Sequence, residues 1–148
     1  TTVTERCFMN DEGIKENASN LPADKIIAAV VLWLDEQCPQ ERWDLSDEQM
    51  CVLLGGITVS TWNQWKETAQ TNDSLQVDQE TIDTLAMLVS IYKMIHLSSP
   101  PGFKYDFFKR PIHHPTFNGK SAREFMLENP SLDDFLKVRN YFQSRVLL

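Results

Sequence analysis

The chain has 148 residues, of which 42% are apolar, and its 21 acidic and 14 basic side chains give a net charge of −7. This apolar fraction can bury a real hydrophobic core, which excludes a chain that is disordered throughout. No apolar run approaches the roughly 20 residues of a membrane-spanning helix, and the N-terminus lacks a basic region followed by an apolar stretch, so we expect a cytoplasmic protein without membrane association.

The first half of the sequence predicts an arm followed by helices. Residues 1–20 are polar and without periodicity, and we expect them to form a flexible arm. From residue 21 to about residue 38, apolar residues fall on one helical face. Ser46 then begins a capping box for a short helix, which ends at Gly55 and Gly56.

Two more helices follow the glycine turn. Thr58 or Ser60 can cap a helix that carries Trp62 and Trp65 on one side. We interpret both tryptophans as core residues, because aromatic residues at helical spacing are more often packed inside a protein than in contact with a ligand. A long amphipathic helix is expected from about residue 78 to residue 96.

Prolines and a glycine at residues 100–102 separate this helix from the C-terminal segment. Residues 103–108 predict a brief aromatic turn, and residues 111–118 predict a loop because of their prolines. Ser121 and Ser131 each begin one further helix. The sequence therefore predicts an all-α fold, a compact multi-helix bundle with a helix-turn-helix-like middle and a small helical C-terminal segment.

The charge is divided unevenly between the three predicted parts, which are an arm over residues 1–20, a helical domain over 21–98 and a C-terminal domain over 103–148. Residues 1–103 hold six basic and sixteen acidic side chains, whereas residues 104–148 hold eight basic and five acidic ones. Phosphate contacts need lysine and arginine, so the acidic part argues against strong affinity for DNA. The basic segment suits an acidic or anion-binding partner.

Two stretches resemble a known protein family. Residues 53–66, LLGGITVSTWNQWK, look like the helix-turn-helix core of Xre-like regulators, in which an LG-I-S element precedes S-T-apolar-x-x-W. Residues 107–111 and 117–126, FFKRP and FNGKSAREFM, are similar to the toxin-binding region of the Xre/MbcA/ParS antitoxins. Phe107 stands where that family usually has tryptophan, and Ala122 stands where it usually has proline. The resemblance covers about residues 45–146.

This resemblance implies a function and two sets of contact residues. Antitoxins of that family are dimers that bind a RES-type toxin, an enzyme that consumes NAD, and block its active site with their C-terminal region. The residues implied to bind the toxin are Gly119, Ser121, Arg123, Arg139, Arg145 and Leu148. If the protein also regulates its own transcription, the residues implied to contact DNA are Ser60, Thr61, Asn63, Gln64 and Lys66.

Simpler interpretations of the same residues stay open. A transcription regulator, or an acidic adaptor without a toxin, would share the helix-turn-helix-like middle. Helix capping alone explains Ser121 almost fully. We expect no catalysis and no cofactor, since the sequence has no phosphate-binding glycine loop, no nucleophile turn and no HExxH motif. His113 and His114 predict a solvated loop rather than a metal site, because no further ligand lies at a suitable spacing.

We also expect a homodimer, because the apolar face of the first helices exceeds what a small bundle needs to bury. The residues of this predicted dimer face are Ile26, Val30, Leu34, Met50 and Leu53. Removal of residues 139–148 is expected to abolish toxin neutralisation and to leave the N-terminal bundle folded, because these residues are terminal. The three cysteines are odd in number and form no CxxC pair, which predicts reduced, structural thiols.

Overall fold

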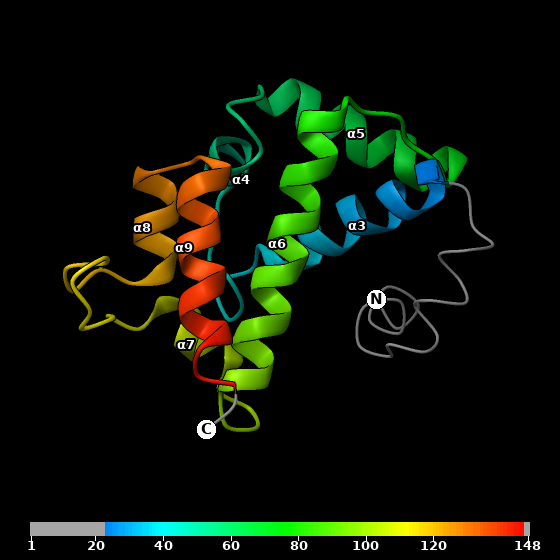
Figure 1. Cartoon of the computed structure of the whole chain (residues 1–148). Helices are drawn as coiled ribbons and strands as arrows, with labels where there is room; N and C mark the ends of the chain where they lie inside the picture. The colour runs from blue at the N-terminus through cyan, green and yellow to red at the C-terminus, as the bar shows by residue number, and fades with distance from the viewer. Residues whose placement is uncertain (1–22, 147–148) are drawn as a thin grey trace.

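The computed structural model describes residues 23–146, which form seven α-helices and contain no β-strand (Figure 1). The all-α fold that the sequence predicts is thereby confirmed. The predicted arm over residues 1–20 lies outside the described residues. No helix between residues 23 and 146 has both the length and the apolar character needed to cross a membrane.

The first three helices lie against one another. They are α3 (Ala23–Gln37), α4 (Asp47–Leu53) and α5 (Val59–Asn72). α5 packs along α3 and also contacts α4. The predicted capping box at Ser46 is present, with Gln49 as its second member, and Thr58 rather than Ser60 caps α5. These local hydrogen bonds satisfy backbone N–H groups that a helix start leaves without partners.

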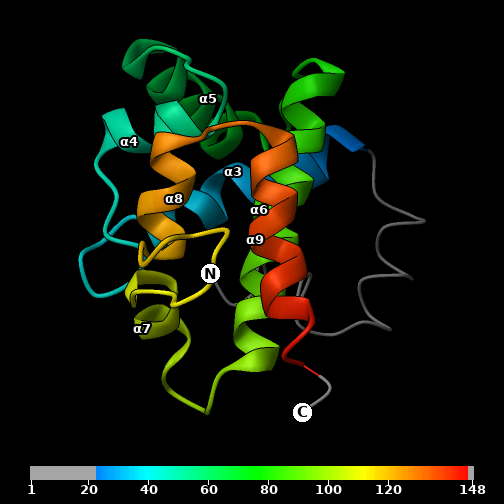
Figure 2. The same cartoon turned by 60° about the vertical axis from the view of Figure 1, so that its left-hand side comes forward.

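The remaining four helices begin with the longest one, and two of the other three contact it. They are α6 (Gln79–Ser98), α7 (Lys104–Lys109), α8 (Ala122–Glu128) and α9 (Leu132–Gln143). α9 runs along α6 in the most extensive helix pair of the described chain, and α8 contacts α4, α7 and α9 (Figures 1 and 2). The C-terminal helices are therefore anchored on the preceding part of the chain, α8 on α4 and α9 on α6.

Aromatic residues form much of the core, and their contacts cross the predicted boundary between residues 98 and 103. Trp43 stacks on Phe108 at 4.8 Å between ring centroids. Trp33 meets both Trp43 and Tyr92 edge to face. Trp62 is fully buried, and Trp65 is half-buried against the same core. The prediction that both tryptophans are core residues is confirmed.

Part of the predicted dimer face is wrong. Leu34, Met50 and Leu53 are each at most 1% exposed, because they pack inside the core of a single chain. They have no surface left to offer to a second copy. Ile26 differs, since it is half-buried and lines a groove between α3 and α6 that is open to solvent, whereas Val30 lines the same groove but is only 7% exposed.

Candidate partner-binding site

A closed loop precedes α8 and carries one of the predicted contact residues. An isolated bridge joins Pro111 to Ser121, and the N–H of Gly119 donates to the carbonyl oxygen of Ile112 at 3.1 Å. Asn118 and Gly119 both have left-handed backbone conformations, with φ of 53° and 84°. A larger side chain at Gly119 would be strained there, since only glycine adopts this region without steric cost. The exposed loop is thus held in one shape by its own backbone.

Ser121 orients this loop and α8 rather than offering a surface. Its hydroxyl accepts from the N–H of Glu124 at 3.0 Å, and the Glu124 carboxylate accepts from the N–H of Ser121 at 3.2 Å. This reciprocal pair is the capping box that the sequence predicts. Because Ser121 is only 2% exposed, a partner could not reach its side chain directly.

Arg123 and Arg139 both bind other parts of the same chain. Arg123 donates to the carbonyl oxygen of Asp44 at 2.8 Å and to the side-chain oxygen of Gln49 at 3.2 Å, so it ties α8 to α4. Arg139 donates to the Ser90 hydroxyl at 2.7 Å and so ties α9 to α6. In the isolated chain, these two guanidinium groups position helices.

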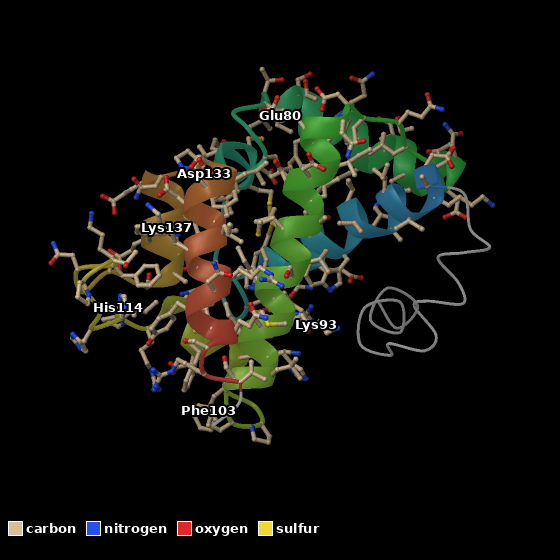
Figure 3. The ribbon with its side chains drawn as sticks, viewed as in Figure 1. Glu80, Lys93, Phe103, His114, Asp133 and Lys137 are labelled. Atoms are coloured by element: carbon tan, nitrogen blue, oxygen red, sulfur yellow. The ribbon has the colours of Figure 1, made fainter. Side chains whose placement is uncertain are left out.

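Arg145 is exposed, whereas the other two predicted contact arginines, Arg123 and Arg139, are half-buried. The Arg145 guanidinium lies 5.4 Å from the ring centroid of Tyr141 and is exposed. Tyr141 in turn lies 5.6 Å from His114 and 5.3 Å from Phe117, which both belong to the loop before α8. The end of α9 and this loop therefore meet on one side of the molecule, where Figure 3 labels His114. Leu148 lies outside the described residues.

We call this region the loop–α9 surface. It consists of His113, His114, Asn118, Gly119, Tyr141 and Arg145. A shallow hollow of about 390 Å³ opens among the loop residues. Sequence reasoning had selected Gly119 and Arg145 but missed His114 and Tyr141. The spacing of four between Tyr141 and Arg145 was a visible helical signal, whereas the contact between Tyr141 and the loop depends on the tertiary fold.

The basic character of the C-terminal segment is mostly used inside the chain. Three ion pairs join its cations to nearby carboxylates, namely Arg110 to Asp106, Lys120 to Glu128 and Lys137 to Asp134. Four other cations donate to neutral oxygens, namely Lys104, Lys109, Arg123 and Arg139. Arg145 is the remaining cation, and its guanidinium makes neither kind of contact with a described residue. Arg145 is therefore the cation of this segment that is left without a hydrogen bond or an ion pair inside the described chain, although the four cations bound to neutral oxygens keep their charge.

The predicted DNA-contact residues lie on α5, after the glycine turn. Ser60, Asn63 and Gln64 are exposed, whereas Thr61 is half-buried and shares a hydrogen bond of 2.9 Å with Thr58. Glu67 is exposed on the same helix, one turn beyond Asn63. This outer face is polar and carries an acidic group, which a DNA phosphate would repel.

Lys66 is the one cation among these residues, and it is engaged within the chain. Its ammonium group lies 3.2 Å from the Asp35 carboxylate and 3.6 Å from that of Asp47. It also lies 5.1 Å from the ring centroid of Trp62. Contact with a phosphate would require Lys66 to leave two carboxylates. α4 and α5 are thus joined by a glycine turn, and the outer face of α5 offers no basic reading surface.

No group of three His, Cys, Asp or Glu side chains in the described part of the chain could hold a metal ion. His113 and His114 are both exposed in the loop. His114 Nδ1 accepts a hydrogen bond of 3.1 Å from the N–H of Thr116. This contact and the ring contact with Tyr141 give His114 a role in shaping the loop.

Cys38 is expected to resist alkylation in the folded protein. Burial, followed by the nearby carboxylates of Asp35 and Asp47, raises the pKa of its thiol from 9.0 to about 12. Since the thiolate is the reactive form, iodoacetamide at pH 8 should label Cys38 far more slowly in the native protein than in urea, as read by peptide mass spectrometry. Equal labelling rates would contradict this assignment.

The same pKa shift fixes how Cys38 affects stability at high pH. The thiol ionises in the unfolded chain near pH 9 but in the folded chain only near pH 12. Its contribution to stability is therefore complete below pH 9 and is lost as the pH rises from 9 to 12. A Cys38→Ala variant should lose less stability over this interval than the wild type.

Comparison with known proteins gives a weak similarity that assigns no family. No protein-family model and no solved structure matches the chain. The chain is similar to the uncharacterized protein y4oB of Sinorhizobium fredii, with 29% identity over 106 residues. The aligned region covers 71% of this chain and 76% of that protein. This similarity extends over most of both sequences and assigns no activity.

Proposed function

We propose that the chain is an antitoxin-like protein that binds a RES-type, NAD-consuming toxin in the cytoplasm and occludes its active site. The C-terminal segment would make the contact, acting as part of a homodimer and without cofactor or catalysis. The proposal rests on the resemblance of residues 53–66 and 107–126 to the Xre/MbcA/ParS antitoxins. One structural observation carries it further: contacts of Tyr141 unite the Gly119 loop and Arg145 on a single exposed face.

Occlusion by this face needs shape and charge rather than chemistry. The loop is fixed by its backbone bridge and by left-handed residues, so little conformational freedom is lost on binding. Arg145 supplies an exposed positive charge on a protein that is acidic as a whole. Such a charge accelerates encounter with an acidic partner surface, and the acceleration fades as salt screens it.

Charge reversal at Arg145 is the direct test. Arg145→Glu is expected to slow association with a RES-type toxin by about tenfold at low salt, with a smaller change at high salt, because rim charges act mainly on the association rate. Stopped-flow fluorescence or surface plasmon resonance measures this rate. The substitution should leave folding unchanged, since the Arg145 side chain is exposed.

A matched control is available on the far side of the molecule. Lys25→Glu makes the same change of charge on α3, whose N-terminal end lies opposite the loop before α8 (Figure 1). It should affect the association rate much less than Arg145→Glu. If the two variants bind with equal rates, then only overall charge matters and the loop–α9 surface is not the binding site.

A transcription regulator is the second candidate function, because α4, the turn at Gly55 and Gly56, and α5 follow one another as in the resemblance to Xre-like regulators, and α5 has an exposed polar face. An antitoxin could also regulate its own transcription through this face. Duplex binding should be measured at low salt, where electrostatic binding is strongest. Absence of binding there would remove the regulator and leave the protein-partner proposal intact.

A further inference from the structure

α6 has an exposed stripe between its two neighbouring helices. Asp83, Ala86, Ser90 and Lys93 are separated by three, four and three residues, so they lie along one side of the helix. Asp83 and Ala86 are exposed, and the other two are half-buried. We call these four residues the α6 stripe.

A groove flanks the α6 stripe on each side. The groove between α3 and α6, of about 250 Å³, is lined by aliphatic side chains, among them Ile26 and Val89. The groove between α6 and α9, of about 510 Å³, is lined by Met87 and by Leu136, which is 41% exposed, and also by the charged Asp133 and Arg139. Ala86 lines both grooves, which places it on the ridge between them. Apolar surface of this kind is typical of a contact with another protein.

We infer that the α6 stripe is the contact between two copies of this chain, with their α6 helices antiparallel. This inference rests on the homodimer of the proposed function and gives it a location. A twofold contact places the same surface on both subunits, so that surface must complement itself. The α6 stripe meets this condition, because its spacing is symmetric about the point midway between Ala86 and Ser90 while its end charges are opposite.

In an antiparallel pairing about that point, side chains of opposite charge face each other at the ends of the stripe and small side chains face each other in its middle. Asp83 lies opposite the partner's Lys93, and the symmetric pair forms at the other end. A parallel pairing would instead set Asp83 against the partner's Asp83, which is repulsive. The charge changes from acidic to basic along α6, with Glu80 at its N-terminal end and Lys93 further along (Figure 3).

The middle of the stripe consists of small side chains. Ala86 then meets the partner's Ser90, whose hydroxyl accepts a hydrogen bond from Arg139 of α9, so the Arg139 side chain lies beside this helix crossing. With the two ridges face to face, the grooves beside them are brought together, so that the aliphatic lining around Ile26 and Val89 becomes buried. Burial of this aliphatic surface supplies a hydrophobic contribution to the free energy of dimerisation, which contacts within the polar stripe alone would lack.

The proposed dimer contact is separate from the loop–α9 surface. Arg145 and His114 line neither groove beside α6. A dimer could therefore present two loop–α9 surfaces at once, and loss of dimerisation need not remove toxin binding. The two proposals can fail independently.

A charge-exchange experiment on the full chain tests the contact. Light scattering of the wild type at micromolar concentration should give about 34 kDa, twice the 17.1 kDa of one chain. Asp83→Lys and Lys93→Asp should each raise the dimer dissociation constant about tenfold or more, and the double variant should restore it, because the exchanged charges again attract. Sedimentation equilibrium measures these constants.

Two further variants complete the design. Ala86→Arg places a long charged side chain on the ridge and should give a monomer with the wild-type circular dichroism, since Ala86 is exposed. Glu67→Lys on α5 makes the same charge change as Asp83→Lys on another exposed helix face and should leave the dimer unaffected. The Ala86→Arg monomer should still bind the toxin through the loop–α9 surface.

Several outcomes would overturn the inference. A wild-type mass of 17 kDa at micromolar concentration rejects the dimer itself. A dimer that survives Ala86→Arg, or a double variant no tighter than its parents, shows that the contact lies elsewhere. If Lys93→Asp lowers the melting temperature, Asp83→Lys decides the matter, because the Asp83 carboxylate accepts a hydrogen bond from Gln79 at the surface and takes no part in the core.

Discussion

Replacement of Trp62 by alanine is expected to destabilise the protein by about 3–5 kcal/mol, the range typical of removing a buried aromatic side chain. Trp62 is 0% exposed and is the one large side chain of α5 that is fully buried. Its removal leaves a cavity where α5 meets the rest of the core. The free energy of unfolding from urea denaturation, followed by circular dichroism, measures this loss.

Two related substitutions show that the loss comes from packing. Trp62→Phe should cost clearly less than Trp62→Ala, because the buried indole N–H of Trp62 has no hydrogen-bond partner among the described atoms. Phenylalanine therefore removes volume without breaking a hydrogen bond. Trp65→Ala should also cost less, since Trp65 is only half-buried. A loss below about 1 kcal/mol for Trp62→Ala would show that the side chain is not a core residue.

The helices could be predicted because their signals are local. Ser46, Ser121 and Ser131 each cap a helix at the position that the sequence indicates, through hydrogen bonds that span three residues. The ambiguity between Thr58 and Ser60 was equally local, since both are good capping residues two positions apart. Helix starts in this chain are thus determined by a few neighbouring side chains.

The pairing of charged residues could not be predicted, because it joins distant parts of the chain. Lys66 meets the Asp35 carboxylate across 31 residues, and Arg123 donates to the backbone carbonyl of Asp44 across 79. The sequence presents Lys66 and Arg123 as surface cations, and only the fold shows that they are engaged. When contact residues are chosen from the sequence by charge alone, the choice therefore includes cations that position helices within the chain as well as cations that are exposed to a partner.

The apolar face assigned to the dimer shows a second limit. Periodicity identifies the buried side of a helix but does not distinguish burial within one chain from burial against a copy. Leu34 and Met50 follow the same pattern as Ile26, yet the first two are fully buried and only Ile26 lines an open groove. The α6 stripe escaped prediction because alanine, serine and two charges read as a solvated helix face.

Deletion of residues 139–148 is now expected to destabilise the whole protein, in contrast to the expectation from the sequence. The deletion removes Phe142, which is 2% exposed, and the hydrogen bond from Arg139 to Ser90 on α6. Loss of a buried phenylalanine alone costs about 3–5 kcal/mol, a large part of the roughly 5–15 kcal/mol that stabilises a typical domain. Circular dichroism should show a melting temperature lower by more than about 10 °C.

The control for this deletion is a shorter one. Removal of residues 145–148 takes away Arg145 but leaves Phe142 and Arg139 in place, so its melting temperature should stay close to that of the wild type. Equal melting temperatures for the long deletion and the wild type would show that the last turns of α9 add nothing to stability. If the long deletion melts early as expected, its failure to neutralise a toxin is explained by unfolding. Only the short deletion and Arg145→Glu then report on the binding surface itself.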